Sequence, residues 1–332
     1  MKFYDANTDG IKGTGEPTIS GWRVGIDVNG DNTPDYFTLT DATGSYSFGD
    51  LDNADKDNNP LTGSDLGPGT YKVIEGTQAN WVATTPISVS VIAGGTGVQS
   101  GGSATADFGN VKLGQTGGKT KGFWGNKNGL ALIRGADIAG LNALNLRKAD
   151  GSNFSMTQKV GASTVEITAA NLYDLTTSEL ASAKVALESW LAGANATNMT
   201  YMLSAQLAAT WLNVNVLGVS GGTMIHVGTL SMWSGNGQGA ALATNLGSLV
   251  SSTGFVKLSD IINSANALLG TNGSILSGNA LRAYAEALKD VCDGFNNNLS
   301  IAVIGLVIGW TDTNFNGVLD PGEGLLGSWL WV

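Results

Sequence analysis

The sequence predicts an α+β multidomain protein, with an N-terminal β-sandwich, a mostly helical middle domain and an orphan β segment at the C-terminus. Three observations lead to this fold class: alternating strand patterns at the start, helical periodicity through the middle, and a return to strand patterns at the end. The 332 residues, 42% of them hydrophobic, suffice for two or three domains with buried cores. We expect these domains at 1–113, 119–300 and 301–332, with a linker at 114–118.

Residues 1–113 have the pattern of an all-β domain. Apolar and polar residues alternate in "GWRVGIDV", "SYSFGDL", "GTYKVIEG" and "ISVSVIAG", and Gly, Asp, Asn and Pro separate these segments. Several short strands at this spacing indicate a β-sandwich. The segment 94–103, "GGTGVQSGGS", predicts a flexible loop between two strands.

Helical periodicity begins after Lys119. In "TTSELASAKVALESWLAG", Thr176 and Glu179 form a capping box, and the pattern stops at Gly193. The segment "NMTYMLSAQLAATWLNV" places five apolar residues on one helix face, namely Met199, Leu203, Leu207, Trp211 and Val214. A third helix, "GNALRAYAEALKDVCDGF", is predicted to end at Gly294, and weaker helical patterns cover 130–147, 240–251 and 258–269.

The final part returns to strand patterns and repeats the beginning of the chain. We expect "IAVIGLVIGW", residues 301–310, to form a buried strand, since it is too short to cross a membrane. At an offset of 307 residues, six identities pair Asp5 with Asp312, Asn7 with Asn314, Gly10 with Gly317, Gly15 with Gly322, Glu16 with Glu323, and Trp22 with Trp329. The segment 310–332 therefore restarts the first domain.

Net charge narrows the classes of partner. The chain carries −10, and residues 1–65 hold 12 acids against four bases. Nucleic acid is therefore a poor candidate partner, and the acidic patch would repel itself unless a cation lies within it. No apolar run is long enough for a membrane span, and no signal peptide precedes the first strand pattern, so we expect a mature or trimmed product. The single cysteine, Cys292, excludes an intrachain disulfide and leaves bound metal as one other source of stability.

Two acidic loops have the spacing of a twelve-residue calcium loop, which takes oxygen ligands at positions 1, 3, 5, 7, 9 and 12 and Gly at position 6. The loop "DANTDGIKGTGE" offers Asp5, Asn7, Asp9, the Ile11 carbonyl and Glu16. The loop "DTNFNGVLDPGE" offers Asp312, Asn314, Asn316, the Val318 carbonyl, Asp320 and Glu323. The alternative is a pair of Asx-rich turns that bind nothing, but the regular spacing and the terminal Glu favour Ca²⁺ with an affinity on the order of 10⁻⁴ M.

Two further acidic clusters leave both interpretations open. The segment "DVNGDNTPD" offers Asp27, Asn29, Asp31 and Asp35 as additional metal ligands, and "DLDNADKDNN" offers Asp50, Asp52, Asp55 and Asp57. Either cluster would complete a shared site with the first loop, or would form a solvated turn.

The C-terminal segment lacks the remaining strands of a sandwich. Alone it would expose large apolar side chains, namely Leu325, Leu326, Trp329, Leu330, Trp331 and Val332. Three arrangements would pair this strand and cover its apolar side chains. The native gene continues past Val332, the strand folds back onto its own chain, or the strand adds to a sheet of a neighbouring subunit. We favour addition to a neighbour, which predicts a head-to-tail homopolymer.

The first segment also carries a family resemblance. The run "KFYDANTDGIKGTGEPTISGW", followed by "TDATGSYSFGDL" and "PGTYKV", resembles the B-type repeat of serine–aspartate-repeat surface adhesins, within the wider collagen-adhesin B-like, prealbumin-like group. The resemblance covers about 1–110 and restarts at 310–332. It implies calcium-ligand roles for Asp5, Asn7, Asp9 and Glu16 in a stiff extracellular stalk. Some domains of that group form Lys–Asn isopeptide cross-links, and the sequence pattern assigns no such pair here.

The middle domain carries a second, less informative resemblance. The segment "TKGFWGNKNG" is similar to the "TPGFWKNH" region of bacterial secreted proteins, which implies an extracellular location and no defined activity. Trp124 in this segment is the best candidate for an exposed aromatic side chain, with a buried position as the favoured alternative. His226, the only histidine, has no nucleophile elbow near it, and Cys292 lies between acids that disfavour a thiolate.

We therefore expect an extracellular structural subunit of a surface filament, stalk or layer, stabilised by calcium and assembled through its C-terminal β segment. The alternative is a secreted or surface adhesin that binds a glycan or a protein on a host or cell surface through the helical domain. We expect no enzymatic activity.

Overall fold

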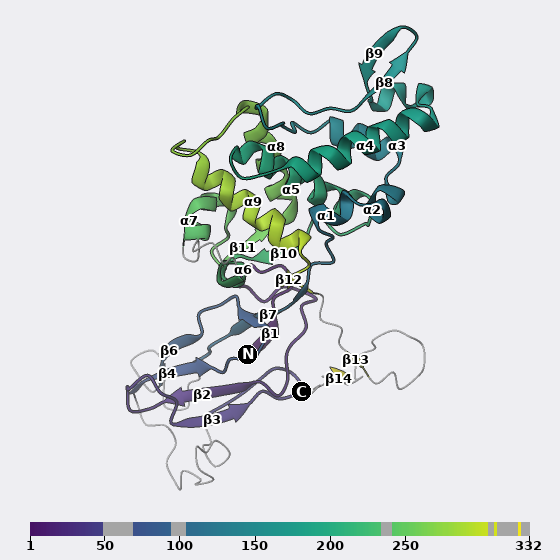
Figure 1. The fold of residues 1–332 in the computed structure, drawn as a ribbon. Helices are drawn as coiled ribbons and strands as arrows, with labels where there is room; N and C mark the ends of the chain where they lie inside the picture. Colours follow the sequence, from purple (N-terminus) through teal and green to yellow (C-terminus); the bar gives the residue numbers. More distant parts are fainter. Residues whose placement is uncertain (49–68, 94–103, 234–240, 305–308, 311–324, 327–332) are drawn as a thin grey trace. The chain divides into compact units, whose positions relative to one another are not determined.

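The computed structural model describes residues 1–332 except 49–68, 94–103, 234–240, 305–308, 311–324 and 327–332 (Figure 1). The chain divides into two compact units: the first contains 1–113 and 304–332, and the second contains 114–303. Helices and several separate sheets are present, which confirms the predicted α+β multidomain fold class.

The first unit contains a four-stranded antiparallel sheet in the order β3-β2-β4-β6. Its strands are β2 (Arg23–Asp27), β3 (Tyr36–Leu39), β4 (Gly69–Glu75) and β6 (Ser88–Ala93). In the register of β2 and β4, Val24 lies opposite Glu75 and Ile26 opposite Val73, and all four residues are buried. Because side chains alternate between the two faces of a strand, this register places Glu75 on the same inward face as Val73.

A second group of strands in the first unit is built around β7 (Phe108–Gln115). The short strand β1 (Lys2–Tyr4) pairs with β7 in parallel, and β5 (Trp81–Ala83) pairs with β7 antiparallel. Trp22, just before β2, packs edge to face against Trp81 of β5, with ring centroids 5.1 Å apart. The core of the first unit therefore lies between its two groups of strands, as in the predicted sandwich.

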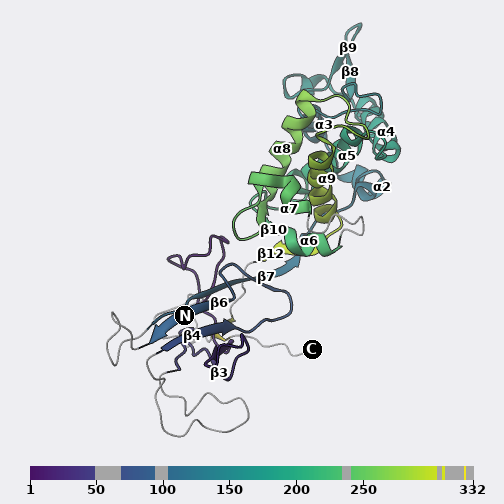
Figure 2. The ribbon, with the colours of Figure 1, turned by 90° about the vertical axis from the view of Figure 1, so that its left-hand side faces the viewer.

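The second unit is mostly helical (Figures 1 and 2). Its helices are α1 (Lys121–Trp124), α2 (Lys127–Leu132), α3 (Gly135–Asn142), α4 (Thr177–Gly193), α5 (Met199–Asn215), α6 (Val227–Trp233), α7 (Ala241–Leu246), α8 (Leu258–Thr271) and α9 (Arg282–Asn296), with 3-10 turns η2 (Ala169–Asp174) and η3 (Gly247–Leu249). Two groups of strands accompany them: the hairpin β8 (Thr157–Val160) and β9 (Ser163–Glu166), and the strands β10 (Met224–His226), β11 (Phe255–Lys257) and β12 (Ser300–Val303). Of these strands the sequence pattern predicted only β12, as the start of the strand expected at 301–310.

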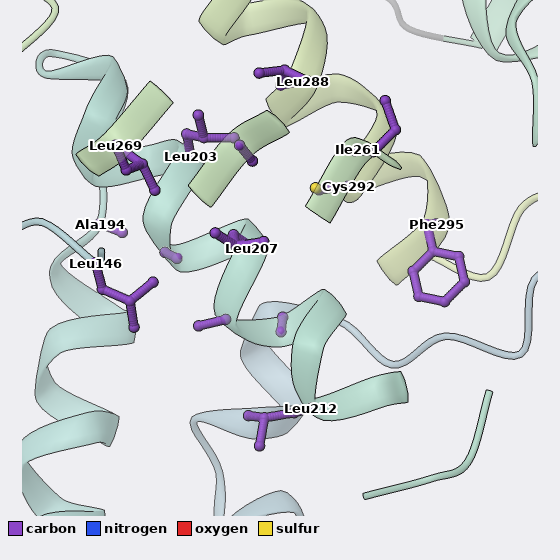
Figure 3. Close-up of a cluster of buried hydrophobic side chains, with 14 of the residues drawn as sticks. Leu146, Ala194, Leu203, Leu207, Leu212, Ile261, Leu269, Leu288, Cys292 and Phe295 are labelled. Atoms are coloured by element: carbon purple, nitrogen blue, oxygen red, sulfur yellow. The ribbon is translucent and has the colours of Figure 1, made fainter. Parts of the chain in front are cut away.

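Helix α5 forms the centre of the second unit. Leu203, Leu207 and Leu212 are fully buried, and they lie among side chains of the surrounding helices such as Ile261 of α8 and Leu288 of α9 (Figure 3). The small residues of α5, Ala205, Ala208 and Ala209, are also buried, so the helix is covered on nearly every side. The predicted apolar face is correct for Met199, Leu203 and Leu207, but the sequence pattern did not predict burial all round.

Helix boundaries confirm some predictions and correct others. The capping box of Thr176 and Glu179 is present at the start of α4, as predicted. Helix α9 continues to Asn296, so the prediction that Gly294 ends it is wrong. A Cβ added at Gly294 would lie 2.4 Å from Leu230 Cδ1, so this glycine permits close packing and does not terminate the helix.

Three strand and loop predictions also need correction. Residues 301–310 do not form one strand, because β12 ends at Val303, and β13 (Gly309–Trp310) is a separate strand that pairs with β14 (Leu325–Leu326). The predicted linker begins inside β7, whose last residues are Gly114 and Gln115. The described part of "SYSFGDL", residues 45–48, forms no strand, and the predicted loop 94–103 lies outside the described residues.

Trp124 is buried in α1, where its Nε1 donates to Asn213 Oδ1 at 3.0 Å, so the alternative of a buried tryptophan is correct. Among the described residues, no helix combines the length and the apolar character that a membrane crossing requires.

Candidate functional site

The first acidic loop closes on itself through its own side chains. Asp5, directly after β1, is fully buried and accepts from the amides of Asp9 at 3.1 Å and Gly10 at 2.7 Å. Gly10 has φ of +79°, the left-handed conformation expected of Gly at position 6 of a calcium loop. Glu16, at the other end, accepts from the amides of Asn7 at 3.4 Å and of Gly13 at 2.9 Å. The structure therefore brings the predicted ligands at both ends of the loop into one closed turn.

The donors of this loop fit calcium in kind. Asp5, Asn7, Asp9, Glu16 and the Ile11 carbonyl are all hard oxygen ligands, which Ca²⁺ prefers, while Gly13 at position 9 adds no side chain. Among the described residues, however, no group of three or more His, Cys, Asp or Glu side chains is arranged so that it could hold a metal ion. Backbone, amide and water oxygens would have to supply the remaining ligands, so calcium binding stays a prediction.

The loop between β2 and β3 repeats this pattern. Asp27 is buried, and its carboxylate accepts from the amides of Gly30 and Asn32, each at 2.7 Å. Burial raises the pKa of Asp27, but the backbone amides around the carboxylate lower it by more, so this pKa lies below its usual value. Asn29 Nδ2 donates to Asp35 Oδ1 at 2.9 Å, and Asp31 Oδ1 accepts from the Thr33 amide at 2.7 Å. These four predicted side chains therefore come from one turn that is closed by its own hydrogen bonds.

The C-terminal predictions lie largely outside the described residues. These are the six ligands of the second loop, Asp312, Asn314, Asn316, Val318, Asp320 and Glu323, together with Trp329 and Trp331. Leu325 and Leu326 form β14. The cluster between 50 and 57 is likewise outside the described residues.

A different polar cluster lies inside the core of the first unit, and we call its three residues, Lys2, Glu75 and Asn110, the buried triad. The Lys2 and Glu75 side chains are 0% and 1% exposed, and Lys2 Nζ lies 2.5 Å from Glu75 Oε1. Lys2 Nζ also donates to Asn110 Oδ1, and it lies 4.2 Å from the centre of a Trp22 ring. The lysine amine is therefore enclosed by a carboxyl group, a carboxamide and an aromatic face.

The two groups of strands bring the triad together. Tyr4 of β1 lies opposite Asn110 of β7 in the parallel register, so Lys2, two residues earlier, faces Asn110 diagonally on the same side of the pair. Glu75 comes from the inward face of β4 in the facing sheet. Backbone hydrogen bonds at both ends of β1 fix this register: Phe108 N donates to Met1 O at 2.9 Å, and Asp5 N donates to Asn110 O at 3.1 Å.

Burial shifts both titratable members of the triad toward their neutral forms. Loss of hydration lowers the pKa of Lys2 from 10.5 to about 8, although the nearby Glu75 charge and hydrogen bond oppose this shift. Burial also raises the pKa of Glu75, against the effects of Lys2 and of hydrogen bonds from Lys2 and Asn110. Glu75 Oε2 is buried without a hydrogen-bond donor among the described residues, which further favours a protonated carboxyl group.

This arrangement has the parts needed for acyl transfer within the protein. A neutral amine is a nucleophile, and the Asn110 carboxamide is the acyl group next to it. Glu75 touches the amine, so it is placed to accept the amine proton and to return it to the departing amide nitrogen. Together the three side chains supply the chemical groups that formation of an amide bond between Lys2 and Asn110 would need.

The sequence analysis missed this site because its members lie on three different strands and are separated by up to 108 positions in the sequence. One signal was available, since each member interrupts an apolar strand at an inward position: Lys2 before Phe3, Glu75 two residues after Val73, and Asn110 two after Phe108. A buried polar residue needs a partner, so three such interruptions in one domain indicate a buried polar cluster, although they do not indicate which residues pair.

His226 and Cys292, for which the sequence predicts no catalytic role, also lack the surroundings of a catalytic residue in the structure. Burial lowers the pKa of His226, whose Nδ1 lies 2.8 Å from Thr229 Oγ1. Cys292 is fully buried in α9, and burial raises the pKa of its thiol to about 12. Neither setting supplies a reactive nucleophile.

Comparison with known proteins adds no family to these observations. No protein-family model matches this chain, and no curated protein is significantly similar to it in sequence.

The lowered pKa of Lys2 predicts a specific pH dependence of stability. In the variant Asn110→Ala the amine keeps its titration, and between about pH 8 and 10.5 it is neutral in the folded protein but still protonated in the unfolded chain. Because the unfolded state then binds more protons, the free energy of unfolding should rise with pH across this window. Denaturant titrations of this variant should show the rise, and those of Lys2→Met/Asn110→Ala should not. Identical pH profiles would contradict the lowered pKa.

Proposed function

We propose that this chain is an extracellular structural subunit of a surface filament, stalk or layer, whose first unit is locked by a covalent amide bond between Lys2 and Asn110. The observation that carries the proposal is the position of the Lys2 amine, buried within hydrogen-bond distance of both Glu75 and Asn110. A permanent internal bond serves a protein that must resist unfolding outside the cell. The protein acts in this proposal as a structural element and not as an enzyme.

The reaction is a single transamidation. Neutral Lys2 Nζ attacks Cγ of Asn110, a new Cγ–Nζ bond forms, and Glu75 takes one of the two Nζ protons as it gives up its own. The Cγ–Nδ2 bond breaks, and Nδ2 takes the proton from Glu75 and leaves as ammonia. No atom is oxidised or reduced, and no co-reactant is needed. Glu75 ends in the protonation state in which it began.

The bond would stabilise the first unit by restricting its unfolded chain. It joins residues 2 and 110, and therefore closes a loop that contains nearly the whole N-terminal sandwich. By the chain-entropy estimate used for disulfides, a covalent closure of roughly 100 residues contributes about 4–5 kcal/mol. This contribution replaces the disulfides that a chain with one cysteine cannot form.

Calcium and self-assembly complete the proposal. The closed loop of oxygen donors between Asp5 and Glu16, within the acidic half of the first unit, supports a calcium site there. The repeat of that loop at 312–323 supports assembly in which the C-terminal β segment adds to a sheet of the next subunit, so that the partner is a second copy of this chain. Net charge and the resemblance to surface adhesins support an extracellular location without nucleic-acid partners.

The amide bond predicts a loss of mass. The intact wild-type protein should be lighter than its sequence by about 17 Da, the mass of ammonia. Lys2→Met and Asn110→Ala should restore the full mass, and Glu75→Gln should restore it in most molecules because the amine proton then has no acceptor. Lys112→Met removes an exposed lysine two residues from Asn110 and should keep the loss.

Intact-mass spectrometry of these variants separates the outcomes. A wild-type protein at full sequence mass would contradict the proposal. A loss of about 18 Da that disappears in Glu75→Gln but persists in Asn110→Ala would mean that Lys2 bonds to Glu75 and releases water instead.

Calcium should stabilise the first unit against thermal unfolding. The effect should be clearest in Lys2→Met, because this variant lacks the cross-link that would otherwise mask the unfolding of the unit. Metal that binds only the folded state adds about 2.7 kcal/mol at a hundred times its dissociation constant. Thermal melting in millimolar calcium and in chelator should therefore differ. Glu16→Ala should reduce this difference more than Asp35→Ala, because position 12 of the loop can offer both oxygens. A melting midpoint that is the same in calcium and in chelator would exclude the calcium site. Equal losses of calcium stabilisation in Glu16→Ala and Asp35→Ala would place the site elsewhere.

Assembly should depend on the C-terminal segment. Deleting residues 310–332 should abolish the ordered oligomers or filaments that electron microscopy detects for the full chain in calcium, because the added strand is then missing. Filaments that persist after the deletion, or a full-length monomer at high calcium, would exclude this mode of assembly.

A further inference from the structure

The start and the end of the second unit are fastened to each other within that unit. Thr116 N donates to Leu299 O at 3.1 Å, and Thr116 Oγ1 donates to Phe295 O at 2.6 Å. The Gly117 amide donates to Asn298 Oδ1 at 2.7 Å. We call the two apposed segments, 116–118 and 295–299, the terminal clamp.

The two backbone segments of the clamp lie in close contact at Gly118. A Cβ added at Gly118 would lie 2.2 Å from Phe295 O, so only glycine allows this approach. Gly117 and Asn298 adopt left-handed conformations, with φ of +79° and +57°, that direct their groups toward each other. Thr116 as a whole residue is 5% exposed, so the hydrogen bond of its side chain to Phe295 O is shielded from water. The clamp is therefore a built contact between the ends of a 190-residue insertion, residues 114–303.

A matching contact holds the two chain segments of the first unit on either side of that insertion. Ile304 N donates to Lys112 O at 3.1 Å, and Tyr4 Oη donates to Ile304 O. Lys112 lies on β7 two residues after Asn110, and Tyr4 lies on β1 two residues after Lys2. Ile304, the first residue after the insertion, is therefore hydrogen-bonded to β1 and β7, the two strands that the amide bond would join.

We propose that the second unit is an extensible element of the chain. The terminal clamp keeps this unit folded until the chain is under tension, and its unfolding then lengthens the chain. This inference rests on the proposed cross-link and load-bearing role. Force applied between the two ends of the chain would pass from Lys2 through the amide bond into Asn110, so residues 3–109 would carry none of it. The force would next reach the contact of Ile304 with Lys112 and Tyr4 and then the clamp, and the interior of the second unit would be loaded only after both have opened.

The two units would then respond to tension in opposite ways. The cross-linked sandwich cannot lengthen without breaking a covalent bond. The second unit can release about 65 nm, because 190 residues extend by roughly 3.4 Å each and the clamped ends start close together. A surface stalk with these properties would stay short under low force and lengthen once the clamp yields, which limits the tension on the neighbouring sandwich domains.

The test is single-molecule stretching of the full chain held at its two ends. The wild-type protein should gain about 65 nm from the second unit, beyond the contribution of residues 304–332, and nothing from the sandwich. Lys2→Met should gain about 36 nm more, because its 107 residues between positions 2 and 110 become extensible. The Lys2→Met result identifies the cross-link and does not depend on the clamp.

Three variants with matched chemistry test the clamp itself. Thr116→Val removes the bond to Phe295, and Asn298→Gly removes the acceptor for Gly117 while allowing the positive φ. Each should open the second unit about fivefold faster at constant force, the ratio expected for one hydrogen bond. Thr200→Val removes a similar bond, from Thr200 Oγ1 to Gly273 O at 2.8 Å, away from the clamp and should leave this opening rate unchanged.

The outcomes separate the two proposals. Equal opening rates in Thr116→Val, Asn298→Gly and wild type, or an equal acceleration by Thr200→Val, would overturn the clamp. A sandwich that extends in the wild-type protein would overturn the cross-link, and the clamp would still be judged by the three variants measured against wild type.

Discussion

A lysine amine enclosed in a sandwich core is the constraint on which the first unit depends. An isolated charge in such a place costs several kcal/mol, so the fold must pair it, neutralise it or consume it. Lys2 is paired with Glu75, and burial moves both groups toward their neutral forms. An amide bond to Asn110 would remove the charge permanently, since an amide needs only hydrogen-bond partners. The arrangement that makes the free lysine costly is thus the arrangement that would make its reaction favourable.

The same short strand connects the other features of this unit. Strand β1 has three residues, too few for backbone pairing alone to hold it firmly. The amide bond would fix its first residue to β7. The acidic loop begins at Asp5, directly after its last residue, and ends at Glu16, and the carbonyl of the next residue, Pro17, accepts from Tyr4 N at 2.8 Å. The proposed calcium and the proposed cross-link therefore act on opposite ends of one strand, and each would limit the opening that the other leaves possible.

Local patterns predicted local structure well. The alternation in "GTYKVIEG" and the capping box of Thr176 and Glu179 depend on neighbours within a few residues, and both elements appear where expected. Gly294 was misinterpreted because its role is set by Leu230, far away in the sequence. The loop from Asp5 to Glu16 could be found because all its donors lie within twelve residues. The buried triad could not be assigned, because it depends on the pairing of β1 with β7 and on the facing position of β4, which no single segment encodes.

The central claim is that Lys2 and Asn110 are covalently joined, and peptide mapping after trypsin digestion tests it most directly. Trypsin does not cleave after a lysine whose amine is part of an amide bond. The account predicts a branched product in which residues 1–12, uncut at Lys2, are attached through Lys2 to Asn110 of the peptide 73–112, and fragmentation should locate the branch at these two residues. Separate linear peptides, with cleavage after Lys2 and an unmodified Asn110, would contradict it.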